Sequence, residues 1–181
     1  MTEPDTVPIA GNEFINTAQS PTEWLTSVEF IDEEHGFVVG TNGILRETRD
    51  RGAIWTERSV SSSDLMSLCF VNESSGWTVA RDGAIIKTTN GGRSWHTQES
   101  GTSGLLSAVS FVDENNGWVV GRNSLILQTV NGDADWHPQN TNMITDLWDV
   151  FHITETDGWA VGLDSTILYT TDAGEGRAHA K

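Results

Sequence analysis

The sequence predicts an all-β protein made of four copies of one unit of about 40 residues. Four glycines, each followed by an aromatic residue, recur at intervals of 40, 41 and 41 residues: Gly36, Gly76, Gly117 and Gly158. An alternating segment such as "LMSLCFVN" precedes each glycine, and a second short apolar stretch follows it. Short β-branched and aromatic runs bounded by Gly, Asn, Asp and Ser are typical of strands and turns. The pattern predicts no helix.

Each repeat predicts four strands. In the second repeat they cover Leu65–Val71, Trp77–Ala80, Ala84–Thr88 and Trp95–Gln98. Four antiparallel strands in a unit of this length are typical of one blade of a β-propeller, because such a unit buries its faces only by stacking on neighbours. We expect the propeller to cover 14–176, with repeats starting near 25, 65, 106 and 147. Residues 1–13 and 177–181 are expected to be tails.

An octet recurs where the third strand of each repeat meets the fourth. It reads "TRDRGAIW" from Thr48, "TTNGGRSW" from Thr88 and "TVNGDADW" from Thr129, while "TTDAGEGR" from Thr170 has Arg177 in place of Trp. We expect a hairpin in which Asp or Asn accepts turn N–H groups, Gly supplies a positive φ and Trp fills the gap between blades. These turn residues are Asp50, Gly52, Trp55, Asn90, Gly92, Trp95, Asn131, Trp136, Asp172 and Gly174.

The octets resemble Asp-boxes, and the pattern F-x-D-x-x-x-G-W-x-V-G-x-x-G-x-I-x-x-T-x-x-G-G-x-x-W resembles the BNR-type repeats of the photosystem II stability/assembly factor family and its non-photosynthetic relatives. The resemblance covers 14–176. It implies a β-propeller that serves as a non-enzymatic binding or assembly scaffold for a protein partner. Asp-boxes also occur in sialidases, other glycosidases and sorting receptors, so a glycoside hydrolase is the alternative.

The fourth repeat lacks an apolar strand after Thr171, so another segment must supply its outer strand. In the two later complete repeats, Trp95 and Trp136 precede the next inner strand by 11 residues, and counting 11 residues back from Leu25 gives Phe14. We therefore expect Phe14 to Gln19 to complete the last blade as an N-terminal strand, because this removes an open sheet edge. Two alternatives remain open: a homo-oligomer that completes a larger ring, and a fragment of a larger propeller.

The charge balance excludes one class of partner. The chain has 26 acidic and 10 basic residues, a net charge of -16. Nucleic acid is a poor partner for such a surface, since binding it requires Lys and Arg to neutralise phosphates. The acids attract a basic partner or adapt the protein to a salty cytoplasm, and their even scatter favours the second explanation. The single cysteine, Cys69, excludes an internal disulfide framework.

The start of the sequence, "MTEPDTVPIAG", has no basic segment and no apolar run, so no secretory signal is predicted. No segment approaches the roughly 18 apolar residues of a membrane span. We expect a cytoplasmic protein of a salt-adapted organism, without the membrane-directing N-terminal signal of the family that it resembles.

The loops between the second and third strands are the strongest candidates for a binding site. They read "TNG", "RDG", "RNS" and "LDS" and are expected to share one face of the propeller. The candidate binding residues in these loops are Arg81, Asp82, Arg122, Asn123 and Asp164. Two neighbouring arginines can bind a carboxylate bidentately, whereas the alternative is that each pairs with an adjacent acid.

Catalytic residues, metal ligands and cofactors are not expected. A glycosidase needs two carboxylates about 5–10 Å apart, for which Asp146 and Asp149 would be the choice. Tyr169, the only tyrosine, occupies a variable strand position, and His96 and His137 fall on separate blades. Small and polar residues of the inner strands suit a narrow, water-filled channel: Ser27, Glu29, Ser67, Cys69, Ala108, Ser110 and Asp149, interrupted by Phe151.

Overall fold

The computed structural model describes residues 23–133, 135–141, 143–174 and the backbone of 179–180. These residues form four antiparallel sheets of four strands each, which confirms the predicted all-β propeller architecture. The only helical element among them is a three-residue 3-10 turn, η1 (Thr41–Gly43). Within every sheet the strands lie side by side in chain order, so each sheet is one repeat of the sequence.

We number the sheets as blades in chain order. Blade 1 consists of β1 (Leu25–Phe30), β2 (Gly36–Gly40), β3 (Ile44–Thr48) and β4 (Thr56–Ser59). Blade 2 consists of β5 (Leu65–Phe70), β6 (Gly76–Ala80), β7 (Ile85–Thr88) and β8 (His96–Gln98). Blade 3 consists of β9 (Leu106–Phe111), β10 (Gly117–Gly121), β11 (Ile126–Thr129) and β12 (His137–Pro138). Blade 4 consists of β13 (Leu147–His152), β14 (Asp157–Gly162), β15 (Ile167–Thr171) and β16 (His179–Ala180).

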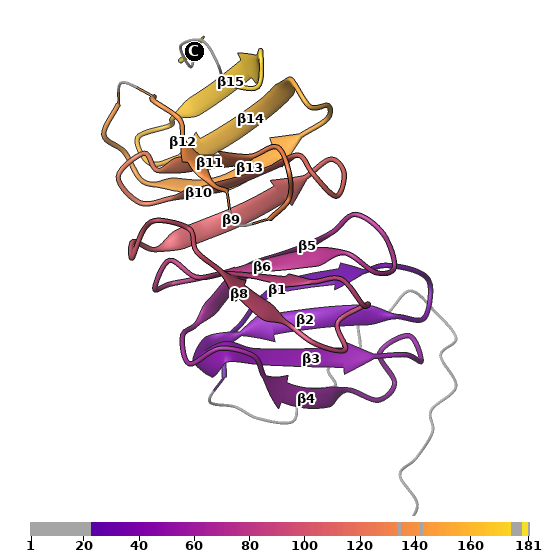
Figure 1. Cartoon of the computed structure of the whole chain (residues 1–181). Coiled ribbons are helices and arrows are strands. Elements are labelled where there is room, and N and C mark those ends of the chain that lie inside the picture. Colours follow the sequence, from indigo (N-terminus) through magenta and orange to yellow (C-terminus); the bar gives the residue numbers. More distant parts are fainter. Residues whose placement is uncertain (1–22, 134, 142, 175–178, 181) are drawn as a thin grey trace, which may run out of the picture.

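The blades are stacked in sequence. The first strand of each blade is its inner strand, and β1 contacts β5, β5 contacts β9, and β9 contacts β13. Figure 1 shows blade 1 at one end of the stack and blade 4 at the other. The described residues therefore form an open arc of four blades rather than a closed ring.

The outer edge of blade 4 differs from the sequence-based expectation. The strand that pairs with β15 is β16, through Leu168 with Ala180 and Tyr169 with His179. The segment expected there, Phe14 to Gln19, lies outside the described residues. The chain's own last residues thus supply a strand where the sequence predicted only a polar tail, because backbone pairing requires no apolar side chain.

The core lies between blades. We call the surface of a blade that faces the preceding blade its leading face, and the surface that faces the next blade its trailing face. Three apolar clusters fill the three junctions, and each combines trailing residues of one blade with leading residues of the next. At the junction of blades 1 and 2, for example, Phe37, Val39 and Leu45 pack against Leu65 and Leu68.

The same aromatic contact holds each junction together. The aromatic residue after the repeated glycine stacks on a ring from the next inner strand: Phe37 on Phe70, Trp77 on Phe111, and Trp118 on His152. The ring centroids are 4.8, 3.6 and 3.6 Å apart, respectively. Offset or parallel stacks of this kind add about 0.5–1.5 kcal/mol to the burial of the rings.

The repeated position must be glycine because the inner-strand ring packs directly against its backbone. The ring of Phe70 lies across Gly76, and a Cβ built on this glycine would come within 2.6 Å of it. The octet tryptophan then meets the same ring edge-on, as Trp95 does with Phe70 and Trp136 with Phe111, at 5.9 Å in both cases. A glycine, an inner-strand aromatic and an octet tryptophan therefore recur together because they form one packed unit.

The octets form hydrogen-bonded turns. In the second octet the Thr88 hydroxyl donates to Asn90 Oδ1 at 3.0 Å and accepts the N–H of Gly92 at 2.9 Å. Asn90 Oδ1 also accepts the N–H of Ser94 at 2.9 Å. Gly92 has a φ of +77°, which is unfavourable for other residues. The turn thus satisfies part of its hydrogen bonding internally, while the Gly91 N–H donates to the carbonyl of Ser74 and the Gly92 carbonyl accepts from Arg58.

Candidate functional site

The loops after the second strands lie beside the segments that enter the next blade, and we call this surface the 2–3 loop face. The N–H of Asn42 in blade 1 donates to Asp64 Oδ1, just before β5, at 3.0 Å. The N–H of Asn123 in blade 3 donates to Asp146 Oδ1, just before β13, at 3.1 Å. Each aspartate therefore bonds the loop of the preceding blade to its own blade, which fixes the loop positions.

Arg81 forms an ion pair within its own blade. Its Nε lies 3.1 Å from Asp64 Oδ2, and the side chain is 57% exposed. Asp64 consequently contacts both Arg81 and the Asn42 loop. Because the hydrogen bond uses Nε, the outer guanidinium nitrogens of Arg81 are available to a second acceptor.

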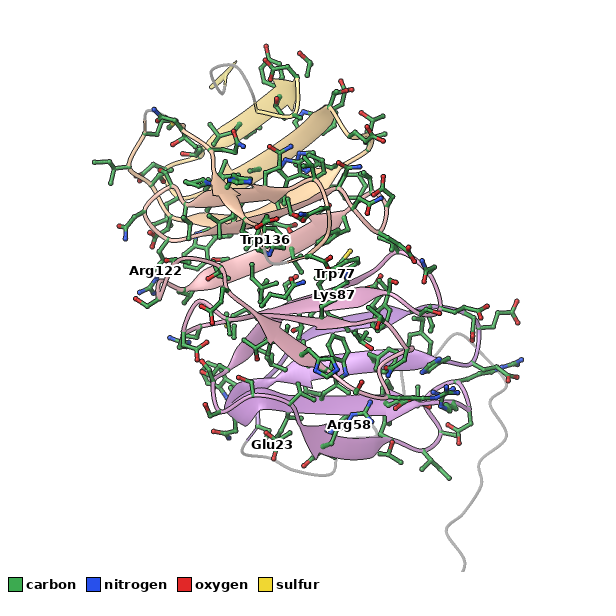
Figure 2. All side chains as sticks on the ribbon, viewed as in Figure 1. Glu23, Arg58, Trp77, Lys87, Arg122 and Trp136 are labelled. Carbon is green, nitrogen blue, oxygen red and sulfur yellow. The ribbon has the colours of Figure 1, made fainter. Side chains whose placement is uncertain are left out.

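Arg122 pairs across a blade junction. Its Nε lies 3.6 Å from Asp146 Oδ2 in the segment that enters blade 4, and its side chain is 53% exposed. Figure 2 shows Arg122 at the edge of the stack, away from Trp77 and Trp136 in the interior. The two arginines thus occupy matching sequence positions but bind aspartates differently, one in its own blade and one in the next.

The remaining candidates on the 2–3 loop face are exposed polar residues with structural roles in their loops. Asp82 Oδ1 accepts the N–H of Ala84 at 3.3 Å. Asn123 and Asp164 have φ values of +57° and +54°, which Asn and Asp tolerate better than most residues. All five predicted binding residues lie in the 2–3 loops, and three of them, Arg81, Arg122 and Asn123, contact the loop-supporting aspartates.

A polar groove lies at the opposite end of blades 1 and 2, between the 1–2 loops and the octets. It has a volume of about 390 Å³, and its walls include Arg49 and Arg93. Arg49 forms an ion pair with Glu47 at 2.6 Å. The two arginines of this groove are exposed and lie at the end of the blades opposite Arg81 and Arg122. Substituting them therefore provides a control for substitutions on the 2–3 loop face.

The side chains considered for glycoside hydrolysis have other partners. Asp146 holds the Asn123 loop and Arg122, as described above. Asp149 Oδ1 accepts the N–H of the adjacent Val150 at 2.9 Å. His96 and His137 lie on the outer strands β8 and β12 of different blades. In the described residues, no three or more His, Cys, Asp or Glu side chains gather as a metal site would require.

The inner-strand polar residues bond neighbouring blades. Glu29 Oε2 accepts the N–H of Phe70 at 3.0 Å, Ser67 Oγ accepts that of Val109 at 3.4 Å, and Ser110 Oγ accepts that of His152 at 3.2 Å. Burial raises the pKa of Glu29 from its ordinary 4.5 to about 7, against the opposing effect of the Phe70 N–H. It also raises the pKa of the neighbouring Cys69 to about 12, so this thiol is protonated at neutral pH.

Glu29 makes stability depend on pH at the junction of blades 1 and 2. Since its folded pKa is raised, its contribution is complete below pH 4.5 and is lost as pH rises through 7. We expect Glu29→Gln, which keeps an acceptor for the Phe70 N–H, to be more stable than the wild type above pH 7 by about 1–2 kcal/mol, allowing for partial solvent exposure. Urea unfolding at pH 5 and pH 8 tests this, and an equal difference at both pH values would contradict it.

Comparison with known families agrees with this architecture. The family model of the photosynthesis system II assembly factor YCF48 matches residues 11–101 and, in a second copy, residues 95–179. The chain belongs to the YCF48 family. A curated relative, the photosystem II assembly lipoprotein Ycf48 of Synechococcus sp. (strain CC9902), is 36% identical over 73 residues, which are 38% of this chain and 22% of that protein. The matched part is therefore about a fifth of the relative's length.

Solved YCF48 structures have the same fold. The structure of YCF48 from Cyanidioschyzon merolae superimposes with a TM-score of 0.71 at 19% identity, over 90% of this chain and 57% of that one. A structure of YCF48 bound to D1 peptide gives a TM-score of 0.59 at 17% identity, over 91% of this chain and 83% of that one. As to membranes, the described part of the chain contains no helix with the length and apolar character of a span.

The two aspartates that support the 2–3 loop face could be found in the sequence but were not recognised there. Asp64 and Asp146 each precede the leucine that begins an inner strand, in the segments "SDLMS" and "TDLWD". The repetition of Asp-Leu at this position in blades 2 and 4 was the available signal. Its meaning depends on contacts between blades, which the periodicity of one repeat does not show.

Proposed function

We propose that this chain is a non-enzymatic binding scaffold that holds a carboxylate-bearing segment of a protein partner on its 2–3 loop face during the assembly of a larger complex. Arg81 and Arg122 would bind the carboxylate, and Asp82, Asn123 and Asp164 would contact the partner's backbone or basic side chains. Family membership supports an assembly role, since the curated relatives are named assembly proteins.

The proposal rests on the exposure of Arg81 and Arg122 and on the nitrogen atom through which each contacts its aspartate. Both side chains are more than half exposed, and both contact their aspartates through Nε. Each guanidinium therefore keeps outer N–H groups for a bidentate or bridging contact with a carboxylate. Ten basic residues in the whole chain make such exposed cationic groups rare on its surface. A partner with a negative group would thus find few competing sites.

The D1 peptide that a solved YCF48 binds is a suitable first probe, in a form with a free C-terminal carboxylate and in an amidated form. We expect the double variant Arg81→Ala, Arg122→Ala to bind the free form at least about tenfold more weakly, because a charge-assisted hydrogen bond contributes about 1.5–3 kcal/mol. Titration calorimetry in molar potassium chloride measures the dissociation constants while salt screens nonspecific charge effects.

The matched control is Arg49→Ala, Arg93→Ala, which removes the same charge from the groove at the other end of the blades. This control should bind the peptide as the wild type does. Equal weakening in both double variants would show a general charge effect, and unchanged binding in the Arg81, Arg122 variant would remove the 2–3 loop face as the site. Unfolding curves for both variants establish that each remains folded.

The glycoside hydrolase alternative has no support from the geometry of its candidate residues, because Asp146 supports a loop and Asp149 bonds its own strand. The compartment stays a prediction. The curated relatives are named lipoproteins.

A further inference from the structure

Most of the exposed large apolar side chains of the described residues lie on the two terminal blades. On blade 1 or its flanking residues they are Trp24, Leu25, Val28, Phe30 and Ile54, and on blade 4 and its loops they are Trp148, Phe151, Ile153, Trp159, Val161, Leu163 and Ile167. Large exposed apolar patches mark interaction sites in soluble proteins. Their positions in the repeat identify what would cover them.

The leading face of blade 1 is equivalent to surfaces that are buried elsewhere in the chain. Val28 is 63% exposed, whereas its equivalents Leu68, Val109 and Val150 in blades 2 to 4 are each 6% exposed. Leu25 is also exposed, although the leucines that begin the other three inner strands are fully buried. In those blades the covering surface is always the trailing face of the preceding blade.

The trailing face of blade 4 is exposed, although the equivalent faces of the other blades are buried. Trp159 is 40% exposed, while Trp77 and Trp118 at the same position are 0% and 2% exposed. Val161 and Ile167 are exposed too, and their equivalents in blade 2, Val79 and Ile85, are fully buried against blade 3. Blade 4 thus presents the surface that three other junctions use, with no blade after it among the described residues (Figure 1).

The aromatic contacts at the two ends are incomplete in complementary ways. At an inner junction the trailing aromatic stacks on an inner-strand ring, which meets an octet tryptophan, as in the series Trp77, Phe111 and Trp136. Blade 1 has the last two members, Phe30 and Trp55, at 6.2 Å in an edge contact, and no preceding ring. Blade 4 has the first member, Trp159. The two ends together make one complete series.

Arg46 distinguishes the leading face of blade 1 from the others. It stands where Ile86, Leu127 and Leu168 stand in blades 2 to 4 and forms ion pairs with Glu23 at 2.6 Å and Glu57 at 2.8 Å. A covering surface must therefore tolerate a cation that is paired with acids.

From these observations we infer that the trailing face of blade 4 packs on the leading face of blade 1 of a second copy of this chain, with Trp159 stacked on Phe30 of that copy. Two copies related by a twofold axis form two identical junctions and close an eight-bladed ring, within the range of about 4–8 blades that propellers adopt. The occupant is another copy because the required surface is the one that this sequence has already built three times.

The net charge of -16 on each copy opposes this association, so it is expected to strengthen with salt. The test is the mass of the full chain by light scattering and sedimentation equilibrium in molar potassium chloride, from about 1 to 100 μM, a range that spans the micromolar affinities of weaker specific complexes. We expect a mass twice that of the 19.8 kDa chain. A monomer throughout the range, or an open series of larger species, would overturn the inference.

Single variants identify the faces. Trp159→Glu and Val28→Glu change exposed side chains on the two terminal faces and should each weaken self-association at least about 100-fold, because a carboxylate would be buried without a partner. The control is Ile144→Glu, at a side chain that is 91% exposed and lies on neither face, and it should associate as the wild type does. Circular dichroism before each measurement confirms that the variants are folded.

Mixing the two variants separates head-to-tail packing from pairing of like faces. The intact trailing face of the Val28→Glu chain and the intact leading face of the Trp159→Glu chain can still form one junction. We therefore expect an equimolar mixture to contain a species of twice the chain mass that neither variant forms alone. If the mixture stays monomeric while the wild type is dimeric, the proposed junction is wrong.

Discussion

Trp77→Ala is expected to lower the free energy of unfolding by about 3–5 kcal/mol, the usual cost of truncating a buried large aromatic side chain. Trp77 is fully buried between blades 2 and 3, where it stacks on Phe111 at 3.6 Å and its Nε1 donates to the carbonyl of Gly132 at 3.4 Å. The indole also lies beneath the Lys87 ammonium, 5.2 Å from the ring centroid (Figure 2). Alanine would remove all three contacts and leave a cavity.

Chemical unfolding of the wild type and the variant in molar potassium chloride measures this loss, at concentrations low enough for the chain to be monomeric. Trp24→Ala is the matched control, since that indole is largely exposed and its loss should change stability by less than about 0.5 kcal/mol. A loss of less than about 1 kcal/mol for Trp77→Ala would mean that the junction of blades 2 and 3 does not depend on its aromatic stack.

The sequence predicted the blades well because one repeat carries its own strand signals. The strands of blade 2 were expected to begin at Leu65, Trp77, Ala84 and Trp95, and they begin at Leu65, Gly76, Ile85 and His96. Alternation of apolar residues and the turn residues of the octet fix these limits locally. No contact with another blade was needed to infer them.

Contacts between blades were predicted less well, because their partners lie about 40 residues apart in the sequence. The polar inner-strand residue Glu29 was expected to line a channel, yet its carboxylate accepts an N–H from the next blade. Pairing of Arg81 and Arg122 with acids was one of the two expectations, but Asp64 and Asp146 were not named as those acids. The outer strand of blade 4 comes from His179–Ala180. The contacts of Glu29 and Arg122 depend on the relative placement of two repeats, which periodicity alone does not specify.

His152→Phe is expected to stabilise the protein by about 2–3 kcal/mol at pH 7, because each buried polar atom without a hydrogen bond costs about 1–3 kcal/mol. The imidazole is buried in blade 4, where it stacks on Trp118 at 3.6 Å, and neither ring nitrogen has a hydrogen-bond partner. Blades 2 and 3 have Phe70 and Phe111 at this position, and Phe111 makes the same close stack with Trp77. A phenyl ring therefore fits the site without a polar atom to satisfy.

The gain should grow as the solution is acidified. Burial lowers the pKa of His152 from its ordinary 6.5 to about 4, so between these values the unfolded chain binds a proton that the folded chain does not. The wild type consequently loses stability as pH falls from 6.5 toward 4, and the Phe variant does not lose this contribution. Carboxylates that titrate in the same range are common to both proteins and cancel in the comparison.

Denaturant unfolding at pH 7.5, 6 and 5 tests both parts of this prediction. A constant difference across the three pH values would mean that the imidazole reaches solvent and titrates normally in the folded protein. A variant less stable than the wild type at pH 7.5 would mean that the imidazole makes a favourable contact that phenyl cannot replace. In either case the stack of His152 on Trp118 would differ in kind from the stack of Phe111 on Trp77. The three junctions would then not be equivalent, and the inferred junction between two copies depends on that equivalence.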